Sequence, residues 1–237
     1  MRSFLILAMF TASLAQAAFS EYEEVRDLRL DAAGLAKLNL QAGAGSLEVT
    51  GVAGQDEIIV TATIHVPTAN EDKARELIES RLVLTLQKDG DEAVLRGYFD
   101  EGRWSWGDSP SVHLEVQVPA RFGLDVDDGS GSIVVNGVSG DIDIDDGSGS
   151  IKMQQVGGTI HIDDGSGSIS VTDAGADVDI EDGSGSITVR GVGGSVTVDD
   201  GSGSINVSEV EHDLIIIDDG SGGLNFSEIK GRVEKDS

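Results

Sequence analysis

Apolar and polar residues follow a fixed pattern over the second half of the chain, and the pattern returns with an 18-residue period. Each period contains two short segments in which every second residue is apolar, one starting at Gly-Ser-Ile in all but the last copy and the other starting at Gly-x-Ile in the first copies. Such alternation is typical of a β-strand that buries one face. The first apolar residues of the successive copies, the last of them after a 19-residue interval, are Ile133, Ile151, Ile169, Ile187, Ile205 and Leu224. We therefore expect two strands in every period.

A repeat at a constant offset places like residues on top of one another when successive turns of the chain run parallel. We therefore predict a mainly β fold, a single-stranded β-solenoid with two-strand, 18-residue coils over residues 123–229. Adjacent coils are expected to lie about 4.8 Å apart, with isoleucine and valine side chains in continuous ladders. A flat meander of hairpins is the alternative, but it does not produce this stacking.

Residues 18–122 are less regular, and they begin with what we interpret as a degenerate coil of the solenoid. The segment Gly45-Ser46-Leu47-Glu48-Val49 matches the Gly-Ser-Ile units, so Leu47 aligns with Ile133. In the same alignment Ile58 takes the place of Ile142. The terminal repeats of a solenoid have to cover an open edge. We therefore assign residues 18–122 to a degenerate coil plus an N-terminal α/β cap.

The cap is expected to contain one short helix. After Pro67, the residues Thr68-Ala69-Asn70-Glu71 have the pattern of a capping box, and apolar residues then recur at helical spacing as far as Arg81. Three further strands are predicted over residues 82–87, 93–99 and 112–118. At the other end, residues 230–237 form a charged tail that could blunt the last strand.

Residues 1–17 have the features of a secretory signal peptide. Arg2 precedes an apolar run from Phe4 to Ala15, and Ala15-Gln16-Ala17 is a small-x-small cleavage site. The apolar run is too short to span a bilayer, and no later segment is long and apolar enough. Because the chain has no cysteine, it offers no disulfide and no lipid-modified cysteine. We expect an exported protein of the periplasm, the cell surface or the extracellular space, without a membrane span.

The chain is strongly acidic, with 43 Asp and Glu, 16 Lys and Arg, and a net charge of −27. Between Gly123 and Glu228 there are 22 acidic residues, and only Lys152 and Arg190 are basic. This charge argues against nucleic acid and anionic lipid as partners. The four histidines are scattered, and neither H-E-x-x-H nor G-x-S-x-G occurs. We therefore expect no catalytic activity.

The Asp-Asp-Gly-Ser-Gly-Ser turns place carboxylates at the same point of every coil. Asp, Ser and Gly are ordinary turn residues, which is the simpler interpretation. Stacked carboxylates repel one another, however, so a divalent cation between two columns, Ca²⁺ in the first place, is an alternative. The known Ca²⁺-binding repeat has an Asp where this chain has Ile133. The candidate ligands are Asp127, Asp128, Asp145, Asp146, Asp163, Asp164, Glu181, Asp182, Asp199, Asp200, Asp218 and Asp219.

Aromatic residues gather at one place after the expected signal peptide, at Tyr98, Phe99, Trp104 and Trp106. Residues two apart on a strand share a face, so Trp104 and Trp106 are candidates for contact with a partner protein or a glycan. Packing within the N-terminal cap is the alternative, because the solenoid contains few other large side chains.

The stretch from Val116 to Val126, with Pro119 before the repeated Gly-Ser-Ile and Gly-Asp-Ile units, resembles the exported bacterial family called putative adhesins. The resemblance covers about residues 24–229, and it implies a β-solenoid domain of unknown function. It implies an exported, non-catalytic binding or structural module of the cell envelope, with an envelope protein or a glycan as partner. The alternatives are a Ca²⁺-binding acidic solenoid and a periplasmic component of an envelope-sensing system.

Overall fold

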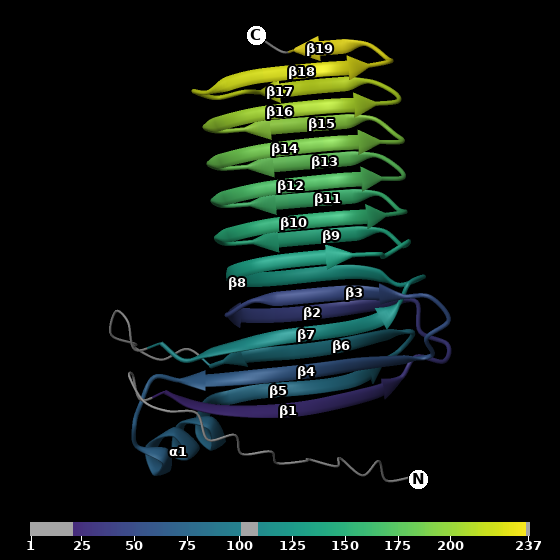
Figure 1. Cartoon of the computed structure of the whole chain (residues 1–237). Coiled ribbons are helices and arrows are strands. Elements are labelled where there is room, and N and C mark those ends of the chain that lie inside the picture. The colour runs from purple at the N-terminus through teal and green to yellow at the C-terminus, as the bar shows by residue number, and fades with distance from the viewer. Residues whose placement is uncertain (1–20, 101–108, 236–237) are drawn as a thin grey trace.

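The computed structural model describes residues 21–100 and 109–235, which form a β-solenoid of two facing sheets (Figure 1). The strands of one sheet, sheet A, pair in a spatial order that differs from the chain order near the N-terminus. In that order sheet A consists of β1 (Tyr22–Asp31), β4 (Glu57–Val66), β7 (Ser111–Pro119), β3 (Leu47–Val52), the second half of β8 (Gly123–Asn136), β10 (Gly149–Val156), β12 (Gly167–Ala174), β14 (Gly185–Val192), β16 (Gly203–Val210) and β18 (Gly223–Ile229).

The facing sheet, sheet B, is built in the same way, and the first half of β8 belongs to it. Its strands in spatial order are β5 (Leu82–Asp89), β6 (Glu92–Phe99), β2 (Lys37–Ala44), β8, β9 (Ile142–Asp146), β11 (Ile160–Asp164), β13 (Val178–Asp182), β15 (Val196–Asp200), β17 (Leu214–Asp218) and β19 (Val233–Lys235). From β2 to β19 every pairing within this sheet is parallel, as expected for a solenoid.

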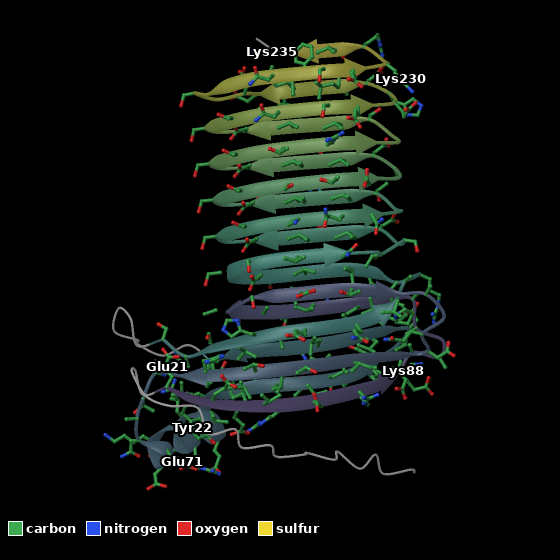
Figure 2. The ribbon with its side chains drawn as sticks, viewed as in Figure 1. Glu21, Tyr22, Glu71, Lys88, Lys230 and Lys235 are labelled. Carbon is green, nitrogen blue, oxygen red and sulfur yellow. The ribbon has the colours of Figure 1, made fainter. Side chains whose placement is uncertain are left out.

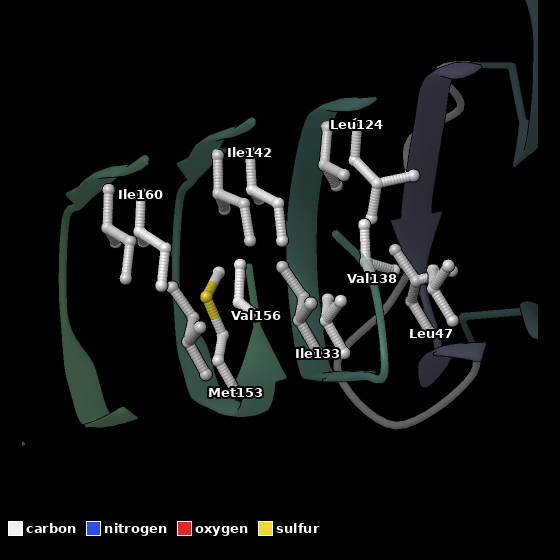
Figure 3. Close-up of a cluster of buried hydrophobic side chains, with 14 of the residues drawn as sticks. Leu47, Leu124, Ile133, Val138, Ile142, Met153, Val156 and Ile160 are labelled. Carbon is white, nitrogen blue, oxygen red and sulfur yellow. The ribbon is translucent and has the colours of Figure 1, made fainter. Parts of the chain in front are cut away.

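The coils stack with the 18-residue offset of the sequence. Ile133, Ile151 and Ile169 pair in register, and each is at most 1% exposed. Apolar side chains of both sheets meet between the layers and fill the interior, as Figure 3 shows for the coils around Met153. Burial of each such side chain contributes roughly 1.5–3 kcal/mol relative to exposure. The predicted β-solenoid is therefore confirmed, and a hairpin meander is not formed here.

The second glycine of each Gly-Ser-Gly-Ser turn is required by the closeness of the coils. Gly167 has a φ of +153°, and a Cβ at this position would lie 1.5 Å from the carbonyl oxygen of Gly149 in the coil before. The equivalent clash recurs at Gly149 and Gly185. The glycine repeat of the sequence is therefore a consequence of backbone contact between coils.

The degenerate coil is formed by β2 and β3, which lie directly against β8. Leu38 pairs with Leu124 and Leu47 with Ile133, as the alignment of Leu47 predicted. The alignment of Ile58 with Ile142 is wrong. Ile58 lies in β4, which reverses direction and runs antiparallel between β1 and β7 in sheet A. The position of β4 in sheet A is therefore determined by its pairing with β1 and β7, and not by its own pattern of apolar residues.

The N-terminal cap contains the expected helix, α1 (Glu71–Arg81), at the β1 and β5 end of the stack (Figure 1). Its N-cap is Asn70, whose side chain accepts a hydrogen bond from the backbone N–H of Lys73 at 3.0 Å. Thr68, the expected capping residue, instead accepts a hydrogen bond from the N–H of Asn70 at 3.2 Å. The helix therefore starts two residues later than the predicted capping box. Ala74 and Ile78 are buried, and they attach the helix to the core.

Candidate functional site

The two acidic columns of the turns lie on opposite faces of sheet B. Alternation continues to the end of the sheet B strands from β8 to β15, so Asp127 points outward and Asp128 points into the solenoid. The inward carboxyls are 0–4% exposed, while their neighbours lie at the surface, where Figure 2 shows the outward side chains along the stack. The inward column, called here the aspartate ladder, consists of Asp128, Asp146, Asp164, Asp182 and Asp200.

In four of the five ladder residues, all except Asp128, one carboxyl oxygen stabilises the turn that follows it. The Oδ1 atom of Asp164 accepts a hydrogen bond from the backbone N–H of Ser166 at 3.0 Å, and Asp182 accepts one from Ser184 at 2.9 Å. Asp146 and Asp200 make the same bond to the serine two residues later. A carboxyl that bonds the N–H two residues on is the ordinary Asx turn, so the simpler interpretation of these turns holds for this oxygen.

The other oxygen of each ladder carboxyl is buried without a hydrogen-bond partner among the described residues. This holds for Oδ2 of all five ladder residues, and for Oδ1 of Asp128 as well. Paired positions follow one another along the ladder, for example Asp146 with Asp164 and Asp164 with Asp182. A buried carboxylate without a partner is costly, so a proton or a cation is needed to neutralise it.

The pKa values of the ladder follow from this environment. Burial raises the pKa of Asp128 to about 7, and the charge of Asp146 adds to the effect. Burial likewise raises the pKa of Asp146 and of Asp182 to about 6. The pKa values of Asp164 and Asp200 are raised for the same reason, although the hydrogen bond from the following serine acts in the opposite direction. Burial therefore shifts the ladder carboxyls toward the protonated, neutral form relative to an exposed aspartate.

The last pair of candidate ligands, Asp218 and Asp219, departs from this arrangement. The pairing of β15 with β17 shifts by one residue before Asp218, which leaves Ile217 45% exposed. Asp218 is exposed and accepts a hydrogen bond from the N–H of Gly220 at 2.9 Å. Asp219 is half-buried and forms an ion pair with Lys235. The 19-residue interval of the sequence is the signal of this irregularity.

The outward column is part of an acidic surface on sheet B. Two of its carboxylates face a basic or titratable neighbour: Lys37 bonds Asp125 at 2.7 Å, and His161 lies 3.5 Å from Asp179. This surface, called here the acidic face, carries Asp125, Asp127, Asp143, Asp145, Asp163, Asp179, Glu181 and Asp199. It places these carboxylates together on one side of the stack.

The outer surface of sheet A has different chemistry. Successive coils present Lys152, Ser170, Thr188 and Asn206 at paired positions, all exposed or half-buried. The one other basic residue of these coils, Arg190, bonds Glu209 at 2.8 Å. This surface, called here the hydroxyl-amide face, is therefore polar and nearly neutral. Sequence reasoning missed the contrast between the faces, although assigning the two strands of each period to separate sheets would have revealed it.

Two of the sequence predictions fall on residues that the structure does not describe. The signal peptide of residues 1–17 and the aromatic pair Trp104 and Trp106 lie outside the described residues. Within residues 21–100 and 109–235, no group of three or more His, Asp or Glu side chains is arranged to hold a metal ion. The same residues contain no helix that is long and apolar enough to cross a bilayer.

Neither a protein-family model nor a curated protein sequence matches this chain. Solved structures do match. A putative adhesin from Bacteroides fragilis has a TM-score of 0.55 at 12% identity, and the match covers 91% of this chain and 97% of the other. A putative adhesin from Parabacteroides distasonis has a TM-score of 0.41 at 12% identity, with 90% and 97% covered. At 12% identity the likeness to the Bacteroides fragilis structure concerns the fold, and at that level it confirms the resemblance inferred from the sequence.

Proposed function

We propose that this chain is an exported, non-catalytic binding module of the cell envelope that makes adhesin-like contacts through one flat face of its solenoid. The observation that carries the proposal is that the two flat faces of the continuous stack of coils differ in chemistry, one acidic and the other polar and nearly neutral. The fold shared with the putative adhesin from Bacteroides fragilis and the signal-peptide pattern of residues 1–17 support it.

The hydroxyl-amide face is the better contact surface for an envelope glycan or protein. Its Ser, Thr, Asn and Gln side chains both donate and accept hydrogen bonds, as a polar partner requires. Paired positions such as Ser170 and Thr188 hold these groups at the fixed spacing of the sheet, so little conformational entropy is lost on binding. The acidic face would be repelled by the anionic components of an envelope.

Two substitutions of threonine by glutamate, one on each face, test which face makes the contact. Thr188 lies on the hydroxyl-amide face and Thr197 on the acidic face, and both side chains reach the surface. We expect Thr188→Glu to weaken sedimentation of the labelled protein with isolated envelopes by about tenfold, the scale of one disrupted central contact. Thr197→Glu should leave it unchanged. Equal loss in both variants, or no binding by the parent chain, would contradict the proposal.

Cation binding is a second candidate function, favoured by the unpartnered Oδ2 atoms of the aspartate ladder. Ca²⁺ takes oxygen ligands, and the turns offer carboxylate and backbone oxygens. Because Asp127 and Asp128 point to opposite faces of sheet B, such an ion would use one column rather than both. Elemental analysis of protein purified without chelator, followed by melts in EDTA and in added Ca²⁺, tests it. Absence of bound metal together with an unchanged Tm would exclude this function.

The third alternative is a periplasmic component of an envelope-sensing system. It differs from glycan binding in that the partner would be a specific envelope protein. It stays a prediction, to be tested by crosslinking in envelopes. A specific protein partner that contacts the hydroxyl-amide face would favour it over glycan binding, and loss of the crosslink in Thr188→Glu would locate the contact.

A further inference from the structure

The large apolar side chains that are exposed in the described residues all lie near the C-terminal end of the stack. They are Ile217 (45% exposed), Phe226 (48%) and Val233 (41%). Phe226 and Val233 belong to β18 and β19, the last strands of sheets A and B. Exposed apolar side chains gathered in one place mark an interaction surface.

The preceding coil, formed by β16 and β17, shows how exposed the equivalent residues are when the next coil covers them. Val207 pairs with Phe226 and is 2% exposed, and Leu214 pairs with Val233 and is 0% exposed. The terminal residues thus continue the same interior ladders, but no described strand covers their outer side. This surface, called here the terminal layer, consists of Leu224, Phe226, Ile229 and Val233.

The last strand of each sheet is also unpaired along its outer edge. Among the described strands, β18 pairs only with β16, and β19 pairs only with β17. Each therefore presents one row of N–H and C=O groups to solvent, in both sheets at the same end of the molecule (Figure 1).

The opposite end is protected. The edge strand β1 carries Glu23, Asp27 and Arg29, and charged residues on an edge discourage further pairing. Helix α1 lies beside it, and no large apolar side chain is exposed among residues 21–100. The two ends of the solenoid are therefore not equivalent, and a head-to-tail contact would bring an apolar layer against a charged edge.

We propose that the terminal layer binds a second copy of this chain, end to end, through a two-fold axis perpendicular to the sheets. This rotation brings β18 against its own copy and β19 against its own copy, antiparallel in both cases. An extended peptide could pair with one edge only, whereas a second copy pairs with both edges and covers Phe226 and Val233 with the same apolar layer. The inference does not depend on the proposed function.

The charge distribution fits this arrangement. Three basic residues lie in the last coil, where Lys230 bonds Glu211 at 2.6 Å, Arg232 bonds Asp213 at 3.2 Å, and Lys235 pairs with Asp219. Figure 2 shows Lys230 and Lys235 at this end. The preceding repeats contain only Lys152 and Arg190 as basic residues. Compared with the preceding repeats, the terminal coil is thus the part where two acidic chains repel each other least.

The contact is small, so the association is expected to be weak. A strand of 7 residues spans about 23 Å, and the two sheets are about 10 Å apart. The area covered per copy is therefore below the roughly 800 Å² of a standard stable interface. Because the whole chain has a net charge of −27, raising the salt concentration should strengthen the association by screening repulsion.

Sedimentation velocity and small-angle scattering of the exported chain test the proposal. Between about 5 and about 500 µM, the mean mass should rise toward twice the monomer mass, with a Kd in the micromolar range or weaker. The maximum dimension should rise toward twice its monomer value, and the dimer fraction should increase between about 0.15 and about 0.5 M NaCl. A monomer at every concentration, a dimer that is wider but not longer, or open-ended filaments would each overturn it.

Two variants distinguish the terminal layer from the faces. Phe226→Glu replaces a side chain that is 48% exposed in the monomer, so the fold should be retained, which circular dichroism verifies. We expect at least a tenfold weaker dimer, because the carboxylate would be buried against its copy (about 1.4 kcal/mol per factor of ten). Thr188→Glu, on sheet A but away from the terminal coil, should dimerise like the parent. Equal dimerisation of the parent and Phe226→Glu would place the contact elsewhere.

Discussion

Asp146 and Asp164 occupy paired positions in β9 and β11, and each has a buried Oδ2 without a hydrogen-bond partner in the described part of the chain. Adjacent parallel strands lie about 4.8 Å apart, so two ionised carboxylates here would repel each other in a poorly solvated environment. Protonation removes both the repulsion and the cost of burying the charge. The stability of the solenoid should therefore depend on pH.

The direction of this dependence follows from the pKa values. The pKa of Asp146 and of Asp182 is about 6 and that of Asp128 about 7 in the folded chain, against 3.8 for an unperturbed Asp. The folded state therefore binds these protons more tightly than the unfolded state. Their contribution is complete below pH 3.8 and is lost as the pH rises through 6 to 7. We expect the Tm, measured by circular dichroism, to fall by several degrees between about pH 5 and about pH 8.

A matched pair of variants assigns this effect to the ladder. Asp146→Asn keeps the shape of the side chain and removes its charge, so it should raise the Tm at about pH 8 and flatten the pH profile. Asp145→Asn changes the neighbouring residue, which points outward, and should leave the slope between about pH 5 and about pH 8 intact. Identical slopes in the two variants would show that the ladder is not the origin.

The second prediction concerns the glycine that allows adjacent coils to approach. In Gly167→Ala, the new Cβ would lie 1.5 Å from the carbonyl oxygen of Gly149, and φ is +153°. The clash can be relieved only by separating two coils, and the positive φ is unfavourable for alanine in any case, so we expect a loss of about 3 kcal/mol or more in urea unfolding. Gly129→Ala is the control, because its nearest atom would be 3.8 Å away. A Gly167→Ala protein as stable as this control would contradict the account of the turns.

The fold of the repeats could be predicted because the 18-residue period determines which residues stack and the apolar alternation determines which side chains are buried. Each apolar position recurs once per 18-residue coil, so identical side chains such as Ile151 and Ile169 stack in only one register. The same alternation also determines the two sides of the acidic turns. Leu124 and Val126 point inward, and continuing the count places Asp128 inside and Asp127 outside. The alternative of a cation between the two columns missed that these columns lie on opposite faces of sheet B.

The N-terminal region could be predicted only in part. The helix and the later strands follow from local patterns, but the place of β4 depends on β1 and β7, which lie far from it in sequence. Likewise both Thr68 and Asn70 are good capping residues, and only the path of the chain after Val66 decides between them. Long-range pairing and competing local signals limit the prediction here.

The third prediction uses a backbone position that recurs once in every coil. Gln155 has a φ of 55°, and Gly137 and Gly191 occupy the equivalent positions with a φ of 72°. The left-handed region costs a non-glycine residue roughly 1 kcal/mol. Gln155→Gly should therefore stabilise the chain by about 0.5–1 kcal/mol in urea unfolding. Gln154→Gly, one residue earlier in the strand β10, should instead destabilise it. A loss of stability in both variants would show that the positive φ at Gln155 carries no conformational cost in the folded chain.

The last prediction compares the middle of the apolar ladder with its end. Ile169 is 1% exposed and is paired on both sides, with Ile151 and Ile187. Ile169→Ala should leave a cavity that the neighbouring coils cannot close, with a loss of about 2–5 kcal/mol. Leu224, at the equivalent position of the last coil, is partly exposed and is paired on one side only, with Ile205.

Leu224→Ala should therefore cost less than half as much as Ile169→Ala, because water already reaches part of the side chain and the coil can relax outward. Both variants are compared by urea unfolding at a protein concentration well below the Kd of the proposed dimer, so that the terminal layer is uncovered. In a solenoid each coil is stabilised by its direct neighbours, so the number of covered sides should determine the cost. Equal losses at the two positions would mean that the last coil is covered even at high dilution, or that the chain unfolds without regard to where the ladder is broken.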